Sequence, residues 1–291
     1  MPEDKLIVIR NNRRSMIRRK LNSLWKLLVK NKITKPCTMG TKLLILATAP
    51  CVKNYFEKES VRQQFKDYDI ACINYMLYYS KKEVFQIKPK YFVLMDPCFY
   101  QEYVVSPNEP PIPSYKEIAK ILEEVDWDCY IVTTVFADFA IKNPHVHYIR
   151  LSCFSTTYKK WKLPILKANY VNLGYYNVIQ GALFFAIVFG YKDVAMMGCP
   201  YKPLNTSMTE EGLHVVEHMH YYDTSPYEYT IPYEELHSRE EGFFMRLNRR
   251  GYLSSRCLWD IKKLADNQGC NILNYSEDSR IDAFRVGKLQ L

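Results

Sequence analysis

Long apolar runs are missing from the sequence, which has no stretch of the roughly 18 apolar residues that a helix needs to cross a bilayer. The G-x-G-x-x-G motif is also missing, and this disfavours a dinucleotide-binding Rossmann site. There is no internal repeat and no low-complexity tract. The composition is that of a globular protein, and the 291 residues suffice for one large domain or two small ones.

Paired cysteine spacing is absent as well. The nine cysteines are scattered, and the start, MPEDKLIVIR, lacks the pattern of a secretory signal peptide. We therefore expect free thiols and a reducing compartment. Tyrosine, in contrast, is abundant at 24 residues, and its flat amphipathic ring suits ring-shaped ligands as well as cores and interfaces.

The positive charge of the chain is concentrated near its N-terminus. Residues 1–36 contain eleven Lys and Arg and two acidic residues, which gives +9, equal to the net charge of the whole chain. The other 255 residues carry 29 basic and 29 acidic side chains. The body is therefore neutral, and we expect a basic arm over residues 1–40 and one α/β domain over residues 41–291.

Residues 11–32 have the pattern of a basic amphipathic helix. Apolar residues recur there at helical spacing: Ile17, Leu21, Leu24, Trp25 and Leu28. Such a helix can lie on an anionic membrane surface, where each basic side chain adds about 1 kcal/mol of attraction. Packing on the protein itself or on a second copy, in a homo-oligomer, is the alternative. Nucleic-acid binding is disfavoured because it has no use for the apolar stripe.

The segment Asn177–Tyr201 organises the rest of the chain. Residues 182–189 are apolar, Gly190 interrupts them, and a second apolar burst of strand length ends at Gly198. This order predicts a helix that is apolar on all sides, a tight turn and a buried parallel strand. Ligands of open α/β sheets bind outside the carboxyl ends of the strands, so the polar residues that flank this segment are candidates for the site.

Alternating short apolar runs and helical patterns predict the fold class. We expect strands over residues 42–47, 69–74, 90–95, 129–133, 146–151, 194–197 and, last, 270–274. Helices are expected over residues 52–65, 115–125 and 238–267, the last with a break near Gly251. The pattern is that of an α/β protein with a single, mostly parallel, nucleotide-binding sheet flanked by helices.

Polar residues follow the first three strands of this predicted sheet. Thr48, Ala49, Pro50 and Cys51 form a turn that leads into a helix, and a helix start presents free N–H groups to phosphate. Asn74 and Asp96 end the next two strands, where they could contact a ribose or a base. The alternative is that both are turn-forming residues.

Residues 199–238 have no clear period and are predicted to form a lid over the site. The lid contains His214, His218 and His220, and histidine is the usual general base near neutral pH. His214 and His218 could bind zinc from one helix face. However, the H-E-x-x-H order is absent and no third ligand is evident, so we predict no metal. Asp126-Trp127-Asp128 precedes a strand and is predicted to be a loop at the opposite sheet edge.

Short motifs in these segments match one family in order. Its first strand leads into Gly-x-Gly-Pro-Ser, here Ala47-Thr48-Ala49-Pro50-Cys51, and its next strands end as Cys72-Ile73-Asn74 and Asp96-Pro97 nearly do. Its central segment corresponds to Gln180-Gly181 through Gly190-Tyr191-Lys192-Asp193, and its lid His-Tyr to His220-Tyr221. Over roughly residues 42–285 the chain resembles bacterial sialyltransferases of lipooligosaccharide outer cores and related capsule- and O-antigen-locus transferases.

The resemblance implies a GT-A-like sheet and an inverting, metal-independent transfer of a sialic acid-like sugar from CMP to a surface glycan or glycolipid. It implies a peripheral location on the cytoplasmic face of the plasma membrane. His220, or His218 in its place, would remove the acceptor proton, and Tyr201 would donate to the leaving phosphate. The implied nucleotide site consists of Thr48, Ala49, Pro50, Cys51, Asn74, Asp96, Asn177, Gln180 and Tyr221.

The chain departs from the family pattern on the donor side. Ala47 and Ala49 replace two turn glycines, and alanine resists a positive φ. Asn177 replaces an arginine and Pro200 an aspartate. Two alternatives therefore stay open, a transferase that uses UDP or another nucleotide and a catalytically inactive protein that binds nucleotide sugars.

Overall fold

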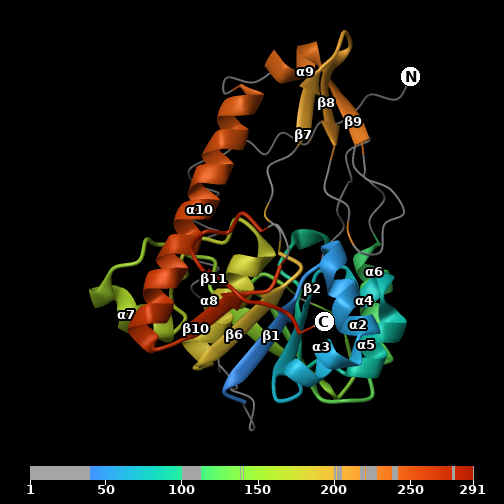
Figure 1. Ribbon diagram of the computed structural model, residues 1–291, viewed down its shortest axis with the longest axis vertical. Helices are drawn as coiled ribbons and strands as arrows, with labels where there is room; N and C mark the ends of the chain where they lie inside the picture. The colour runs from blue at the N-terminus through green and yellow to red at the C-terminus, as the bar shows by residue number, and fades with distance from the viewer. Residues whose placement is uncertain are drawn as a thin grey trace.

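Two β-sheets and a long helix form the framework of the described part of the chain (Figure 1). The computed structural model describes residues 40–99, 113–137, 139, 141–199, 201, 205–216, 220, 228–237, 242–276 and 279–290. The predicted arm up to residue 39, and with it the amphipathic helix, lies outside the described residues. So do His218 and Tyr221.

The larger sheet has eight strands in the order β11-β10-β6-β1-β2-β3-β4-β5. Its strands are β1 (Lys42–Leu46), β2 (Asp69–Ile73), β3 (Tyr91–Val93), β4 (Cys129–Thr134), β5 (Val146–Leu151), β6 (Asp193–Met197), β10 (Asn271–Asn274) and β11 (Arg285–Val286). Every neighbouring pair is parallel, which confirms the predicted α/β class. β11 was not predicted, because its two residues are exposed and give no apolar pattern.

Helices cover both faces of this sheet (Figure 1). One face packs against α2 (Lys53–Glu57), α3 (Glu59–Gln64), α4 (Met76–Tyr79), α5 (Lys81–Ile87) and α6 (Tyr115–Glu123). The other packs against α7 (Leu163–Lys167), α8 (Val178–Phe189) and α10 (Phe243–Gln268). Short 3-10 turns are η1 (Pro50–Val52), η2 (Pro97–Phe99) and η3 (Lys160–Lys162). Strands buried on both faces explain the uninterrupted apolar runs of the sequence.

α8 is the buried centre of the second face. All twelve of its residues are buried, as its apolar sequence predicts. Asn177 and Gln180 form a capping box at its start, and Gly190 ends it with a φ of 100°. The helix packs against α10 and contacts β2 and β3, so its N-terminus is directed to the carboxyl edge of the sheet.

The residues after α8 hold the opposite, amino edge together. The Tyr191 hydroxyl donates to the Asp69 carboxylate at 2.5 Å and lies 2.8 Å from the Tyr91 hydroxyl. Lys192 Nζ donates to the Gln268 carbonyl at 2.9 Å. The Gly-Tyr-Lys-Asp sequence therefore ties β6 to β2, β3 and the end of α10.

A small antiparallel sheet lies at the other end of α10, apart from the larger sheet (Figure 1). It consists of β7 (Asn205–Met208), β8 (Gly212–Val216) and β9 (Glu228–Pro232), and α9 (Tyr233–His237) follows it. Leu213, Val215, Ile231 and Leu236 form its own core, against which Phe243 of α10 packs. The predicted lid thus contains regular structure that its sequence did not reveal.

α10 is continuous from residue 243 to residue 268, so the predicted break near Gly251 is wrong. Gly251 lies in an exposed turn of the helix, and a Cβ atom there would meet no atom within 4 Å. Glycine lowers helix stability but does not break a helix that tertiary contacts hold on both sides. Gly269 ends α10 in the left-handed conformation.

Gly181 and Gly251 allow a paired prediction on stability. A Cβ on Gly181 would lie 2.0 Å from Met95 Sδ, so alanine there should cost about 1–3 kcal/mol through overpacking. Alanine at Gly251 should instead stabilise by about 0.5–1 kcal/mol, because nothing obstructs it and helix propensity rises. Urea unfolding of both variants measures the difference. A neutral Gly181→Ala would contradict the close approach of α8 to the end of β3.

Candidate active site

The strand order of the larger sheet reverses at β1, which has β2 on one side and β6 on the other. The turns after β1 and β6 contact each other, since Ala47 N donates to Met197 O at 2.8 Å and Ala49 N to Gly198 O at 3.2 Å. Ligands of doubly wound sheets bind in the crevice at such a reversal. The predicted turn at residues 48–51 lies at this point.

The alanines that replace the turn glycines are not strained. Ala49 has a φ of −73°, and Ala47 is not among the non-glycine residues with positive φ. The glycine that this crossing requires is Gly198, with a φ of 82°. A Cβ on Gly198 would lie 2.4 Å from Val52 Cγ2 and 3.0 Å from the Ala47 carbonyl carbon. The alanine turn is therefore compatible with a ligand site.

Asn74 and Asp96 lie together at the carboxyl ends of β2 and β3, as the parallel sheet predicts. Asn74 has a φ of 48°, and its side chain hydrogen-bonds to the Asp96 carboxylate. Asp96 is exposed, but desolvation by the surrounding protein raises the pKa of its carboxyl. The hydrogen bond with Asn74 lowers this pKa and so opposes the larger effect. Asn74 Oδ1 is buried and has no hydrogen-bond donor within the described residues.

The largest cavity that we describe has a volume of about 880 Å³. It lies between the start of α8, Tyr201 in the segment after β6, and the middle of α10. Its lining is Tyr175, Tyr176, Asn177, Tyr201, Leu247, Asn248, Arg250, Gly251, Tyr252, Ser254, Ser255 and Arg280. Four tyrosines and two arginines are present, and none of the described lining residues is a carboxylate. We call this space the tyrosine–arginine cavity. Its charge and its rings fit an anionic ligand that contains a ring.

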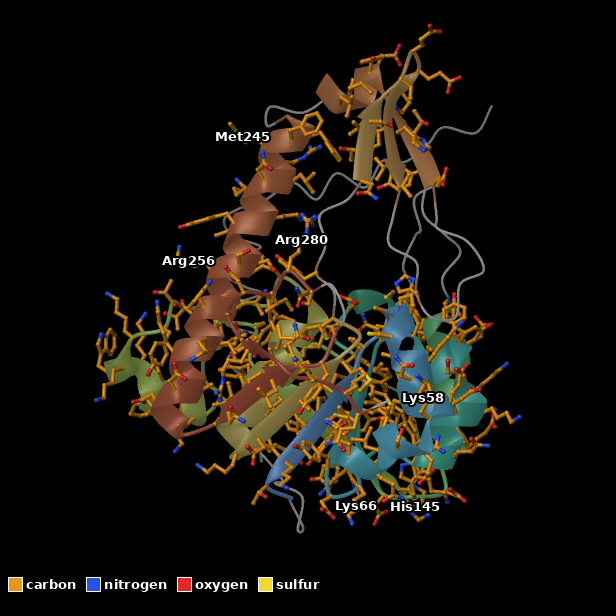
Figure 2. All side chains as sticks on the ribbon, viewed as in Figure 1. Lys58, Lys66, His145, Met245, Arg256 and Arg280 are labelled. Carbon is orange, nitrogen blue, oxygen red and sulfur yellow. The ribbon has the colours of Figure 1, made fainter. Side chains whose placement is uncertain are left out.

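The two arginines of this cavity have no carboxylate partner among the described residues. Neither Arg250 nor Arg280 forms an ion pair with a carboxylate in the part of the chain that the structure describes. Figure 2 shows Arg280 beside the middle of α10, near the carboxyl edge of the sheet. A guanidinium group matches the geometry of a phosphate or a carboxylate, so an anionic ligand would supply the missing partner.

Two tyrosines of the cavity have unusual surroundings. Tyr175 Oη is buried without a hydrogen-bond partner among the described residues, and burial raises the pKa of Tyr175 well above its ordinary value. The hydroxyl therefore stays protonated, and it lies in the interior near Cys257 and Cys153. Tyr201 has a φ of 46°, a left-handed conformation that is uncommon for a bulky residue. Such strain often marks a functional position.

A smaller cavity of about 340 Å³ adjoins the tyrosine–arginine cavity. Asp96, Thr134, Ser152 and Ser155 are among its lining residues, and it shares residues 175–177 with its larger neighbour. The carboxyl ends of β3, β4 and β5 thus open onto the same surface as Tyr201. Of the predicted site residues, Asp96, Asn177 and Tyr201 line this pair of cavities.

Gln180 lines neither cavity, because its polar atoms bind other parts of the protein. Its Oε1 accepts from Tyr176 N at 2.6 Å and from Asn177 N at 3.1 Å. Its Nε2 donates to Ser254 O at 2.9 Å and to Ser254 Oγ at 2.7 Å. The fully buried side chain thereby positions residues 176 and 177 against α10.

Replacing Gln180 with methionine should lower the free energy of unfolding by about 2–3 kcal/mol, because the N–H groups of Tyr176 and Asn177 lose their acceptor. Urea unfolding measures the loss. Gln63→Met is the matched control, since Gln63 is exposed and its side chain bonds to the exposed Glu59. We expect the control to change stability by less than about 0.5 kcal/mol. Equal effects of the two substitutions would contradict the positioning role.

The histidines of the predicted lid are only partly described. His220 is half-buried and has an interaction partner. His214 lies on β8, with Nε2 3.5 Å from Glu228 Oε2, so the idea that it shares a helix face with His218 is wrong. Over the described ranges, no group of three or more His, Cys, Asp and Glu side chains gathers as metal ligands would.

Asp126-Trp127-Asp128 is a loop at the amino edge, as predicted. Asp126 Oδ1 accepts from Lys88 Nζ at 2.9 Å, and Asp128 Oδ1 lies 2.9 Å from His145 Nδ1. Both carboxylates thus have basic partners, and they lie at the opposite edge from the cavities. The eight described cysteines are all free, in agreement with their unpaired spacing.

Sequence reasoning missed Arg250, Arg280, Tyr175 and Tyr252. The two arginines come from segments that follow the predicted lid, and nothing in their local sequence separates them from other exposed arginines. Tyr175 and Tyr176 directly precede the cap of the buried helix, in the loop between α7 and α8. That position was a usable signal for the tyrosine pair.

No family model, curated protein or solved structure matches the chain. Function must therefore be argued from the geometry of the site together with the sequence motifs. Within the described ranges, no helix combines the length and the apolar character that crossing a bilayer requires.

Proposed function

We propose that the chain is an inverting, metal-independent glycosyltransferase that moves a sugar from a nucleotide-sugar donor to a surface-glycan acceptor. The tyrosine–arginine cavity carries this proposal, because it joins cationic groups, hydroxyl donors and rings at the carboxyl edge of a doubly wound sheet. A nucleotide sugar has the complementary parts, which are an anionic phosphate, a sugar ring and a base.

The residues of the cavity suit the leaving group. When the bond from the sugar to the phosphate breaks, the nucleotide leaves with the electron pair and gains negative charge. Arg250 and Arg280 can balance that charge, and Tyr201 can donate a hydrogen bond to a phosphate oxygen. The acceptor hydroxyl attacks the opposite face of the sugar and passes its proton to a base, for which we propose His220.

The polar side chains at the ends of β2 and β3 favour cytosine over uracil as the base of the donor. Asn74 Oδ1 and the Asp96 carboxylate are both hydrogen-bond acceptors, and Asn74 Oδ1 lacks a donor within the described residues. Cytosine presents an N4 amino donor, whereas uracil presents a carbonyl acceptor at the same position. Acceptors at these strand ends would suit the N4 amino group, and they therefore support a CMP-linked donor, with an acidic, sialic acid-like sugar, over a UDP-linked one.

A donor screen tests the proposal with the full chain. CMP-, UDP-, GDP- and dTDP-sugars are added in thermal-shift assays, and donor hydrolysis and transfer are followed by mass spectrometry. A CMP-sugar at 100 times its Kd should stabilise the fold by about 2.7 kcal/mol. Preference for a UDP-sugar would support the alternative donor, and binding without turnover the inactive protein. No response to any nucleotide sugar would refute the proposal.

A further inference from the structure

The outer face of α10 carries a stripe of exposed apolar side chains. Met245 is 65% exposed, Tyr252 64% and Trp259 44%, and their spacing of seven residues places them on one face of the helix. Each is followed four residues later by a cation, namely Arg249, Arg256 and Lys263. Figure 2 shows Met245 and Arg256 on the flank of α10 that faces away from the small sheet.

A second group of similar composition lies beside α10. In the segment 158–170, Trp161 is 72% exposed, and Ile165 and Tyr170 are exposed as well. The same segment contains Lys159, Lys160, Lys162 and Lys167 and no acidic residue. Figure 1 shows its helix, α7, next to the lower half of α10.

The two groups are joined by contacts and form one surface. Tyr158 N donates to Asp260 Oδ2 of α10 at 3.0 Å. Residues 155–157 and Arg256 line the same small cavity between the two elements. The acidic residues nearby are engaged, because Asp260 is buried and also approaches Lys263 at 3.5 Å, while Asp266 binds Lys262. The seven basic residues named above outnumber these two acids, so the net charge of this surface is positive.

We propose that the outer face of α10 and the segment 158–170 form one docking surface for an anionic lipid bilayer. Exposed tryptophan, tyrosine and aliphatic side chains enter the headgroup region, and long basic side chains reach the anionic lipids around them. A second copy of the chain would bring like charges together. A nucleic acid would use the cations and rings, but it has no use for Met245 and Ile165.

Docking in this orientation has a consequence for the active site. Tyr252 belongs both to the stripe and to the lining of the tyrosine–arginine cavity, so the mouth of that cavity would lie near the lipid headgroups. This fits an acceptor that is carried on a lipid, a step that rests on the proposed function. The docking surface itself requires no activity, and its test uses none.

Tryptophan fluorescence can test the docking surface in the full chain. In a Trp25→Phe variant, the remaining tryptophans are Trp127, Trp161 and Trp259. Vesicles of phosphatidylcholine and phosphatidylglycerol with brominated acyl chains should quench this emission. The matched variant that also carries Trp161→Phe and Trp259→Phe should show little quenching. Its remaining Trp127 packs against Phe85 on the other face of the larger sheet. No quenching in the first variant would overturn the proposal, even if the chain binds the vesicles through its N-terminal arm.

Charge reversal gives a second measurement. Lys160→Glu combined with Lys167→Glu should weaken binding to phosphatidylglycerol vesicles by about tenfold or more. Lys58→Glu combined with Lys66→Glu is the control, since Figure 2 shows both residues on the other side of the molecule. Equal losses in the two double variants would overturn the proposal. Tighter binding to a single-stranded RNA than to vesicles would also overturn it, in favour of a nucleic-acid surface. Thermal melting shows that each variant folds.

Discussion

Replacing Arg250 and Arg280 together with glutamine is expected to weaken binding of the nucleotide-sugar donor by about 10²–10⁴-fold. The estimate takes each charged hydrogen bond as about 1.5–3 kcal/mol, and a factor of ten in Kd as about 1.4 kcal/mol. Neither arginine pairs with a carboxylate in the described residues, so glutamine leaves no buried acid unpaired. Calorimetric titration with a CMP-sugar measures the loss, and thermal melting shows that the fold is kept.

Arg256→Gln is the matched control for this experiment. Arg256 lies on the same helix but does not line the tyrosine–arginine cavity. We expect its Kd for the donor to equal that of the unaltered chain in a membrane-free assay. If Arg256→Gln weakened binding as much as the double variant, the effect would come from the general positive field of α10. That result would contradict the assignment of the tyrosine–arginine cavity as the donor site.

The motif that is most specific in the resemblance contributes to the fold more than to the site. Gly190 ends α8, and Tyr191 and Lys192 bind Asp69 and the end of α10 at the amino edge of the sheet. The segment could be predicted from sequence because its helix and its strand consist mostly of apolar residues. The motif therefore predicts the arrangement of the sheet but does not determine which substrate binds.

The carboxyl edge could be predicted in part. Parallel strands bring their ends to one edge, so the positions of Asn74 and Asp96 followed from the strand pattern alone. The role of Gln180 did not, because its partner Ser254 lies 74 residues away on α10. A single sequence does not reveal which face of α10 turns towards the sheet until the packing is known. Arg250 and Ser254 were missed for this reason.

The small sheet escaped prediction for a different reason. Its strands have four or five residues, and β7 is exposed along its whole length, so no apolar alternation is visible there. Four residues form its core, with help from Phe243 at the start of α10. A sheet of this size depends on tertiary contacts for its stability, and short segments of this kind are indistinguishable from a loop in a sequence.

His220→Ala is expected to lower the rate of transfer by about 10²–10⁴-fold, the usual contribution of a positioned general base. Donor binding should be unchanged, because the base acts on the acceptor hydroxyl rather than on the nucleotide. Single-turnover kinetics with saturating donor measure the rate, and calorimetry measures donor binding. His220→Gln should fail in the same way, since an amide can hold the hydroxyl but cannot take its proton.

His214→Ala separates the chemistry of the base from the integrity of the small sheet. His214 belongs to the same predicted lid, and its Nε2 is 3.5 Å from Glu228 Oε2 on the neighbouring strand. We expect this variant to keep its turnover, because that contact joins two strands and reaches no acceptor. If both substitutions slowed transfer equally, the reaction would depend on the integrity of the small sheet, and His220 would not be assigned as the base. If His220→Ala turned over normally, the proton would have to leave by another route, and His218 would be the next base to replace.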